Sequence, residues 1–470
     1  MTDQATPDGR WLVILGAAAG LSALLPARAA LLPAALALLL LLSWWILQTP
    51  QRWVRVLLVT TLLLPPLPFA LGGTGPHPAL LVAALGGMAG LIYLNRFRFA
   101  LDFSGAALLL LWFVLLGSAG LAAIYSGAAV AAASLARILL FGISVYVYFY
   151  VRGLARSSSW RTAPLVFAAA SISALFACVD FYYQLPAPAG FSPQFVWLDT
   201  GVYRRAQGVF YDAGMLGNFC AFFLVMSAVA LTRPRRERPL ALVWLIPGGA
   251  LLAGALLFSY SRASIASLAV SLLALAVVRM RTTSPLRLTL GLGMALATAA
   301  AVGFQFLPAL TRAYWERLWA SAAYFFSFTE GVLSGRVESW SFLLSFLSDH
   351  PWHAIVGIGY KTLPYSDFVG RPVIADNMYL SMLVETGIVG LSAMLLLHAA
   401  ILRAGYRAAT HPDPKASFFG QWIFCFWVGQ VVQMLSADVL TYWRVLPVYF
   451  WTLAVAVRLS DDHLVSRSIQ

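Results

Sequence analysis

The sequence reads GRVESW at Gly335–Trp340, SDHPWHAIVGIGYK at Ser348–Lys361 and ADNMYLSMLVETGIVGL at Ala375–Leu391. These segments belong to one long stretch, from about Pro308 to Gly390, that interrupts an otherwise almost unbroken series of apolar segments. The stretch brings arginines, carboxylates and histidines into a chain that is otherwise poor in charge. If the protein carries out chemistry, we expect the reacting groups here.

The composition decides the class of protein. The 470 residues are 61% hydrophobic and 10% charged, whereas soluble domains are about 45–50% apolar and about 25% charged. The apolar runs have the length of about 16–25 residues with which a helix crosses a bilayer, and they lack the alternation of a barrel strand. We therefore predict an all-α fold, a polytopic membrane bundle of about 12–14 transmembrane helices.

The apolar runs also predict the organisation of the chain. Spans are expected near 11–25, 29–47, 54–71, 78–94, 104–124, 130–150, 163–183, 213–231, 240–258, 264–279, 287–306, 377–402, 418–436 and 442–459. Residues 1–306 thus form membrane helices with a short loop at 184–212, residues 307–376 form a large loop, and residues 377–470 return to the membrane. The run Trp11–Leu25 is read as a retained span, because a second apolar run follows it at once. A re-entrant hairpin of the first two runs is the alternative.

Basic residues indicate which loops face the cytoplasm, because cytoplasmic loops are enriched in Lys and Arg. Clusters of basic residues occur on every second predicted loop, on the same side as both termini. The large loop 307–376 falls on the other, outer side. Cys178, Cys220 and Cys425 lie far apart in apolar runs, which is typical of packing rather than of disulfides or a metal site.

Several basic residues are expected on the outer side against this bias. They are Arg204, Arg205, Arg262, Arg312, Arg317, Arg336, Lys361, Arg371 and Arg444. Guanidinium binds phosphate in a planar, bidentate way, so these residues favour an anionic partner. The alternatives are a genome that encodes arginine freely and, for Arg262 in its short turn, an interfacial anchor that reaches the lipid headgroups.

The outer loop has two segments with helical spacing of apolar residues. Leu310–Phe328 is rich in aromatic residues and predicts a helix that lies in the interface. A second amphipathic helix is predicted from Arg336 to Asp349, where Asp349 and Pro351 end it. The two helices and the turn Gly357–Gly359 form either a lid over a lipid-linked substrate or a structural cap.

The order of short motifs resembles a known family. After Arg336 come Trp340, an HP pair, GIG, then Asn-x-Tyr-Leu and ETGIVGL, which open the next span. The segments Arg205–Phe219 and Ser261–Ser264 are similar as well. Together they resemble the O-antigen ligase and polymerase superfamily over about 200–390.

The resemblance implies an activity and a place in the cell. Members of this family are metal-independent membrane glycosyltransferases of the GT-C kind, without a cofactor. They take a glycan from an undecaprenyl diphosphate carrier at the outer face of the bacterial inner membrane, so the active site is expected to face the periplasm. The acceptor is lipid A core in ligases and another carrier-linked glycan in polymerases. Partners would be these lipid-linked substrates, the bilayer and a chain-length regulator or other assembly proteins, but no nucleic acid.

One position separates this chain from the ligases that it resembles. Ligases have histidine before Asn-x-Tyr-Leu, where this chain has Asp376. We therefore expect a polymerase of O-antigen or exopolysaccharide repeats, with a ligase as the alternative. A transporter or a flippase for lipid-linked glycans is the rival from another class, although transporters place coupling carboxylates near the bilayer midplane in repeated halves.

The reaction implied by the resemblance assigns roles to residues. A diphosphate leaving group gathers negative charge that fixed cations stabilise, and the acceptor hydroxyl needs a base or an orienting group. Candidates for the catalytic group are Asp376, His350 and Glu338, with His353 and Asp349 also within the stretch. Candidates for binding the diphosphate and glycan are Arg204, Arg205, Arg262, Arg336, Arg371, Asn377 and Tyr379. Asp376 at the start of a helix also predicts an N-cap, a role without chemistry.

Overall fold

The computed structural model describes residues 31–67, 76–154, 159–188, 190–198, 201–280, 305, 312 and 336–467. These residues are helical or irregular apart from one antiparallel pair of short strands, β1 (Phe195–Leu198) and β2 (Gly201–Arg204). The predicted span at 11–25 lies outside the described residues, and of the predicted span at 287–306 and the predicted helix at Leu310–Phe328 only residues 305 and 312 are described.

The helices follow the predicted spans closely. They are α2 (Leu31–Leu47), α3 (Pro50–Leu63), α4 (Pro78–Ile92), α5 (Phe103–Ser126), α6 (Ala128–Gly153), α7 (Ser159–Tyr183), α8 (Ala213–Leu231), α9 (Leu242–Phe258), α10 (Arg262–Arg279), α13 (Arg336–Asp349), α14 (His353–Val356), α15 (Met378–Ala409), α16 (Pro414–Gln433) and α17 (Leu446–Arg467). Short 3-10 turns are η1 (Leu94–Arg96), η2 (Gly208–Phe210), η3 (Arg235–Glu237) and η4 (Val439–Thr441). Every predicted span that reaches into the described residues overlaps a helix.

Six of the described helices are long and apolar enough to cross a membrane: α5, α6, α7, α8, α10 and α15. Three shorter apolar segments are α4, α9 and Leu36–Leu47 of α2. Large apolar side chains such as Leu91 and Ile124 are exposed on the bundle, as expected where lipid rather than water is the solvent. The chain is therefore a polytopic helical membrane protein, as its composition predicts.

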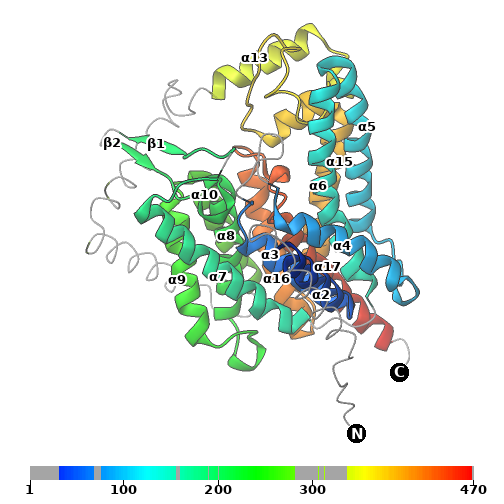
Figure 1. Cartoon of the computed structure of the whole chain (residues 1–470), viewed down its shortest axis with the longest axis vertical. Coiled ribbons are helices and arrows are strands. Elements are labelled where there is room, and N and C mark those ends of the chain that lie inside the picture. Colours follow the sequence, from blue (N-terminus) through cyan, green and yellow to red (C-terminus); the bar gives the residue numbers. More distant parts are fainter. Residues whose placement is uncertain are drawn as a thin grey trace.

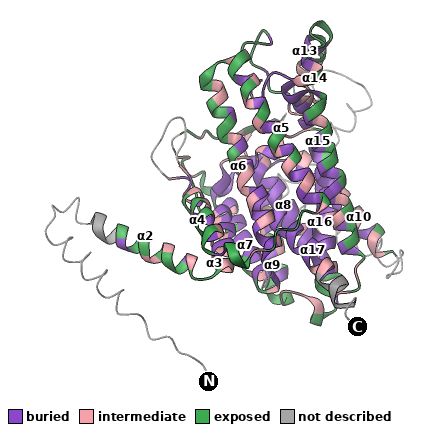
Figure 2. Cartoon of the chain, turned by 90° about the vertical axis from the view of Figure 1, so that its right-hand side faces the viewer, coloured by how far each residue is buried: buried purple, intermediate pink, exposed green. Residues whose placement is uncertain are grey.

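Helix α8 forms the centre of the bundle. It contacts α9, α10 and α16, and Figure 2 shows it almost wholly in the buried colour. Its fully buried Phe222 packs against Trp422 of α16 and Tyr449 of α17, with ring centroids 4.6 and 4.4 Å apart. These aromatic contacts fix α16 and α17 around α8, and with them the loops at the helix ends.

Polar side chains define where several helices begin. Asp102, Asp212, Ser261, Asn377 and Asp413 each accept a hydrogen bond from a backbone N–H two or three residues further on. Such N-caps satisfy donors that the first helical turn leaves without a partner. Three of these caps start α8, α10 and α15 and so hold the residues next to them in place.

Helix α13 lies across the ends of the long helices, at the top of Figure 1 and away from both termini. Its bounds, Arg336–Asp349, confirm the second predicted amphipathic helix. It buries Leu343, Phe346 and Leu347, and Trp340 Nε1 donates to the carbonyl of Ala375 at 2.6 Å. We call this end of the bundle the α13 end.

Two glycine motifs interlock where the loop after α13 meets α15. The N–H groups of Ile358 and Gly359 donate to the carbonyl oxygen of Glu385 at 3.2 and 2.8 Å. Gly387 has φ +68°, which interrupts α15, and a Cβ there would lie 2.1 Å from the carbonyl oxygen of Ile355. Only glycine permits this close approach at a positive φ, so the GIG and ETG segments are matched parts of one contact.

Candidate functional site

Three arginines from separate parts of the chain meet at the α13 end. Arg205 follows β2, Arg262 is the first residue of α10, and Arg336 is the first residue of α13. Arg205 and Arg336 both lie close enough to repel Arg262 electrostatically. A cluster of like charges opposes its own formation, so it favours an anion that neutralises it.

The backbone around the first two arginines holds them together. Arg205 Nε donates to the carbonyl of Ser259 at 2.8 Å, and the next N–H, of Ala206, donates to the carbonyl of Phe258 at 2.8 Å. The acceptors are the last residue of α9 and the residue after it, which opens the short turn that leads into Arg262. The loop after β2 is thereby fixed to the start of α10.

A buried chain of polar side chains lies beneath Arg262. Ser264 Oγ accepts from Gln433 Nε2 at 3.0 Å, and Gln433 Oε1 accepts from Asn218 Nδ2 at 2.9 Å. Tyr449 completes the chain by donating its hydroxyl to Asn218 Oδ1 at 2.6 Å. Buried, satisfied polar networks of this kind specify one arrangement of helices, and here they fix the first turn of α10.

Arg336 pairs with Asp376, the residue that the sequence singled out. Arg336 Nε lies 3.2 Å from Asp376 Oδ2, with the side chains 25% and 47% exposed. Asp376 has φ +46°, a left-handed conformation that aspartate tolerates better than most residues. Its carboxylate thus lies beside the arginine cluster and is accessible to solvent.

The N-cap of α15 is Asn377, not Asp376. Asn377 Oδ1 accepts from the N–H groups of Tyr379 and Leu380 at 3.0 and 3.2 Å. The capping role considered for Asp376 is therefore wrong, because the neighbouring amide already satisfies these donors. The carboxylate of Asp376 is left to pair with Arg336.

Two further charged groups lie near this carboxylate, Lys361 and Asp438. Lys361 was expected among the outer basic residues that favour an anionic partner, whereas its pairing with a carboxylate was not expected. Lys361 forms an ion pair with Asp438, which precedes η4. Burial lowers the pKa of Lys361, while the charges of Glu385 and Asp376 raise it. Only weak features of the sequence pointed to this ion pair: Lys361 is one of the few lysines, and Asp438 lies near the end of a predicted span.

Tyr442 connects the arginine cluster to the start of α8. Its pKa is raised well above the ordinary value, first by burial and then by the charge of Asp212, with a smaller increase from Asp376; Arg205 lowers it. The hydroxyl also lies where a side chain on Gly214 would be, since a Cβ there would approach it to 2.7 Å. Tyr442 is a neutral hydroxyl among the charged groups.

Other predicted residues have structural partners elsewhere. Arg204 forms a buried ion pair with Asp180 at 3.3 Å and donates to the carbonyl of Leu185 at 2.7 Å. Tyr379 donates its hydroxyl to the carbonyl of Val431 at 2.8 Å. The contacts of Arg204 connect the strand pair to α7, and the contact of Tyr379 connects α15 to α16.

Glu338 and His350 lie on α13 but at different ends of it. Glu338 pairs with Arg371 at 2.9 Å, and both side chains are more than half exposed. His350 follows the C-terminal end of α13 and stacks on Phe346 with ring centroids 4.9 Å apart. At 1.5 Å per residue, His350 is about 20 Å along the helix from Arg336. The structure thus separates His350 from Asp376, whereas Glu338 lies only two residues after Arg336 on α13.

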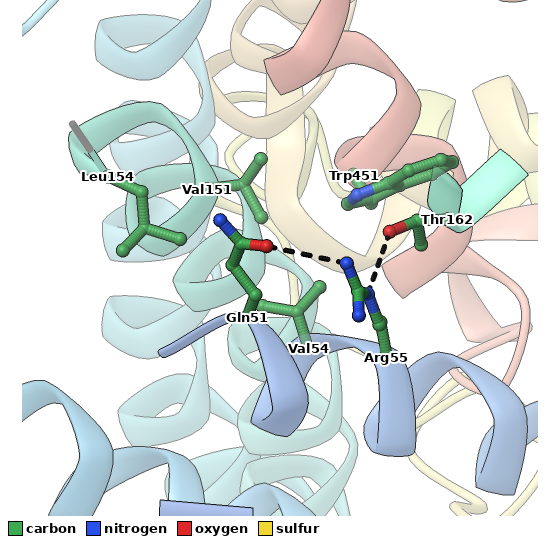
Figure 3. A pocket seen from close by; sticks show the side chains of 7 residues that line it. All are labelled: Gln51, Val54, Arg55, Val151, Leu154, Thr162 and Trp451. Atoms are coloured by element: carbon green, nitrogen blue, oxygen red, sulfur yellow. Dashed lines mark hydrogen bonds between the residues drawn. The ribbon is translucent and has the colours of Figure 1, made fainter. Parts of the chain in front are cut away.

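A small cavity lies at the opposite end of the bundle. Figure 3 shows its lining, in which Arg55 of α3 donates to Gln51 Oε1 at 3.4 Å and to Thr162 Oγ1 of α7 at 3.2 Å. Its volume is about 10 Å³, room for one water molecule. This cavity is too small for a substrate.

The chain also matches a known family over part of its length. Residues 247–395 match the family model described as O-antigen ligase. The match confirms the resemblance to the O-antigen ligase and polymerase superfamily. It includes Arg262, Arg336, Lys361 and Asp376, while Arg205 lies before it. No curated protein is similar enough to this chain to count as a relative.

Proposed function

We propose that this chain is a glycosyltransferase that takes a glycan from undecaprenyl diphosphate at the outer face of the bacterial inner membrane. The α13 end then faces the periplasm. The observation that carries the proposal is the meeting of Arg205, Arg262 and Arg336 beside Asp376. The family match supports the broader assignment to ligase or polymerase activity.

The proposed reaction follows from these groups. The acceptor hydroxyl attacks the anomeric carbon of the donor sugar, and the bond from that carbon to the diphosphate oxygen breaks. The arginines stabilise the charge that grows on the leaving diphosphate. The proton of the hydroxyl passes to Asp376, or is held by it until solvent takes the proton.

In this scheme the guanidinium of Arg336 can pair with either the Asp376 carboxylate or the donor diphosphate. Arg336 Nε pairs with Asp376 Oδ2 at 3.2 Å. A bound diphosphate would compete for the same guanidinium. Asp376 would then be released to accept the hydrogen bond of the acceptor, so that the base becomes active only when donor is present.

Among the activities of this family we propose polymerisation of O-antigen or exopolysaccharide repeats. Aspartate at position 376, where ligases have histidine, supports this assignment. A ligase that joins the glycan to lipid A core is the second candidate, because the matching family model is described as O-antigen ligase.

The glycan made by a deletion strain tests the proposal. Loss of a polymerase should leave chains of a single repeat, whereas loss of a ligase should leave long chains on the carrier. Complementation with the intact gene must restore the original glycan. Unchanged glycans in the deletion strain would contradict both assignments.

A further inference from the structure

A cleft lies at the end of the bundle opposite the α13 end. It has a volume of about 220 Å³ and is lined by residues of α5, α15 and α17 and by Asp102, which caps α5. Arg403 lies about 40 Å along α15 from Asp376 at 1.5 Å per residue, slightly less in space because of the kink at Gly387. Headgroup layers on the two sides of a bilayer are separated by a similar distance, since the whole bilayer is about 40–45 Å thick. The cleft is therefore level with the second layer of headgroups.

The acidic groups that line this cleft are engaged within the protein. Asp102 accepts from the hydroxyl of Tyr148 at 2.6 Å and from the N–H of Gly105 at 2.9 Å. Asp461 forms an ion pair with Arg152, whose Nε also lies 4.0 Å from Asp102. Both carboxylates thus have partners within the protein.

The two arginines that line the cleft, unlike these carboxylates, are not engaged in hydrogen bonds or ion pairs among the described residues. Arg403 and Arg407 are exposed and lie one turn apart on α15. Within the described residues, neither guanidinium has a hydrogen bond or ion pair, and Arg403 only lies over the ring of Phe103, 5.7 Å from its centroid. The cleft therefore offers two free cations above a floor that includes Phe103, Ala400 and Val457.

We propose that this cleft binds the phosphate headgroup of an anionic phospholipid from the leaflet opposite the α13 end. The guanidinium groups bind the phosphate oxygens, and the apolar floor takes the first part of the acyl chains. Basic pockets between membrane helices suit anionic lipids for this reason. The proposal is independent of the transfer reaction, since the cleft and the arginine cluster lie at opposite ends of α15.

The test measures how much lipid half-saturates the thermal stabilisation of the purified full chain in detergent. Phosphatidylglycerol, phosphatidylcholine and inorganic phosphate are titrated separately. We expect stabilisation by phosphatidylglycerol only, and about a 30-fold higher half-saturating concentration for the double variant Arg403→Gln/Arg407→Gln, at about a factor of five for each basic residue. The matched control is Arg235→Gln/Arg236→Gln, which removes two exposed charges on η3 outside the cleft and should change nothing.

Each other result overturns the proposal. An unchanged phosphatidylglycerol titration in the double variant would show that the cleft is not the site. Equal stabilisation by inorganic phosphate would show a site for free anions rather than for lipid. If the double variant does not fold, Ala404→Leu narrows the cleft and retains both arginines, and it should weaken lipid binding too; normal binding by that variant would also refute the proposal.

Discussion

Replacement by alanine should mainly reduce transfer activity at Arg262 and mainly reduce thermal stability at Arg204. Arg262 is partly buried and is repelled by Arg336 and Arg205, so its removal takes away one proposed diphosphate contact and also relieves repulsion. A charge-assisted hydrogen bond contributes about 1.5–3 kcal/mol, and about 1.4 kcal/mol corresponds to a tenfold change in rate. We expect Arg262→Ala to lose about tenfold to a hundredfold in transfer, with a smaller loss of thermal stability than Arg204→Ala.

Arg204 is the matched control, because it is also an arginine and its carboxylate partner, Asp180, is known and buried. Arg204→Ala leaves Asp180 without its ion pair, and breaking a buried pair costs about 3–5 kcal/mol. This variant should lose stability first, and transfer only as folded protein is lost. Arg262→Lys separates charge from geometry, since ammonium cannot make the bidentate contact, and it should remain well below the original activity.

The assay compares glycan transfer from a lipid-linked donor in proteoliposomes with thermal unfolding of the same preparations in detergent. Activity is expressed per correctly inserted protein. Full transfer activity in Arg262→Ala would refute the reasoning and show that Arg262 is an interfacial anchor. The same loss of stability in both variants would also refute it, because the cluster would then not be a set of repelling charges.

Three further predictions address the base, the topology and the kink. Asp376→Asn should fold normally, because the neighbouring residue caps the helix, yet lose transfer by at least about tenfold; retained activity would exclude the carboxylate as base and direct attention to Glu338. Cysteines at the exposed positions Ser341 and Thr232 should react with a membrane-impermeant reagent from opposite sides, and labelling from one side would contradict the topology. Gly387→Ala should destabilise the fold by more than about 2 kcal/mol, because a Cβ would meet the backbone of the loop before Gly359. The control is Gly117→Ala, where a Cβ meets nothing within 4 Å, and it should be neutral or slightly stabilising in thermal unfolding. Equal effects of the two substitutions on stability would refute this account of the kink.

Local pattern was enough to predict most helices. Apolar runs of membrane length placed α5 to α8 within a few residues of their observed bounds, because a bilayer accepts a spanning segment only if its backbone is satisfied internally. The bounds of α13 followed from the spacing of its apolar residues and from the proline after it. Both inferences depend on residues that are near one another in sequence.

The start of α15 shows where local pattern was ambiguous. Asp376 and Asn377 are both good capping residues, and the sequence does not choose between them. The choice depends on φ: Asp376 is at +46°, and only Asn377 directs its oxygen at the first free N–H groups. The loop before α15 sets that angle through Trp340, which holds the carbonyl of Ala375.

The site itself depended on tertiary structure. The sequence listed Arg205, Arg262 and Arg336 among the candidates for binding the diphosphate. It also listed Arg204 for binding and His350 for catalysis, and the fold directs these two to Asp180 and Phe346. It gave no role to the ion pair of Lys361 with Asp438. Composition and periodicity determine that a segment is a helix and that it enters a membrane, since both follow from neighbouring residues. Which charged side chains meet depends on how helices far apart in the chain pack, and only the buried contacts around α8 and α15 decide that.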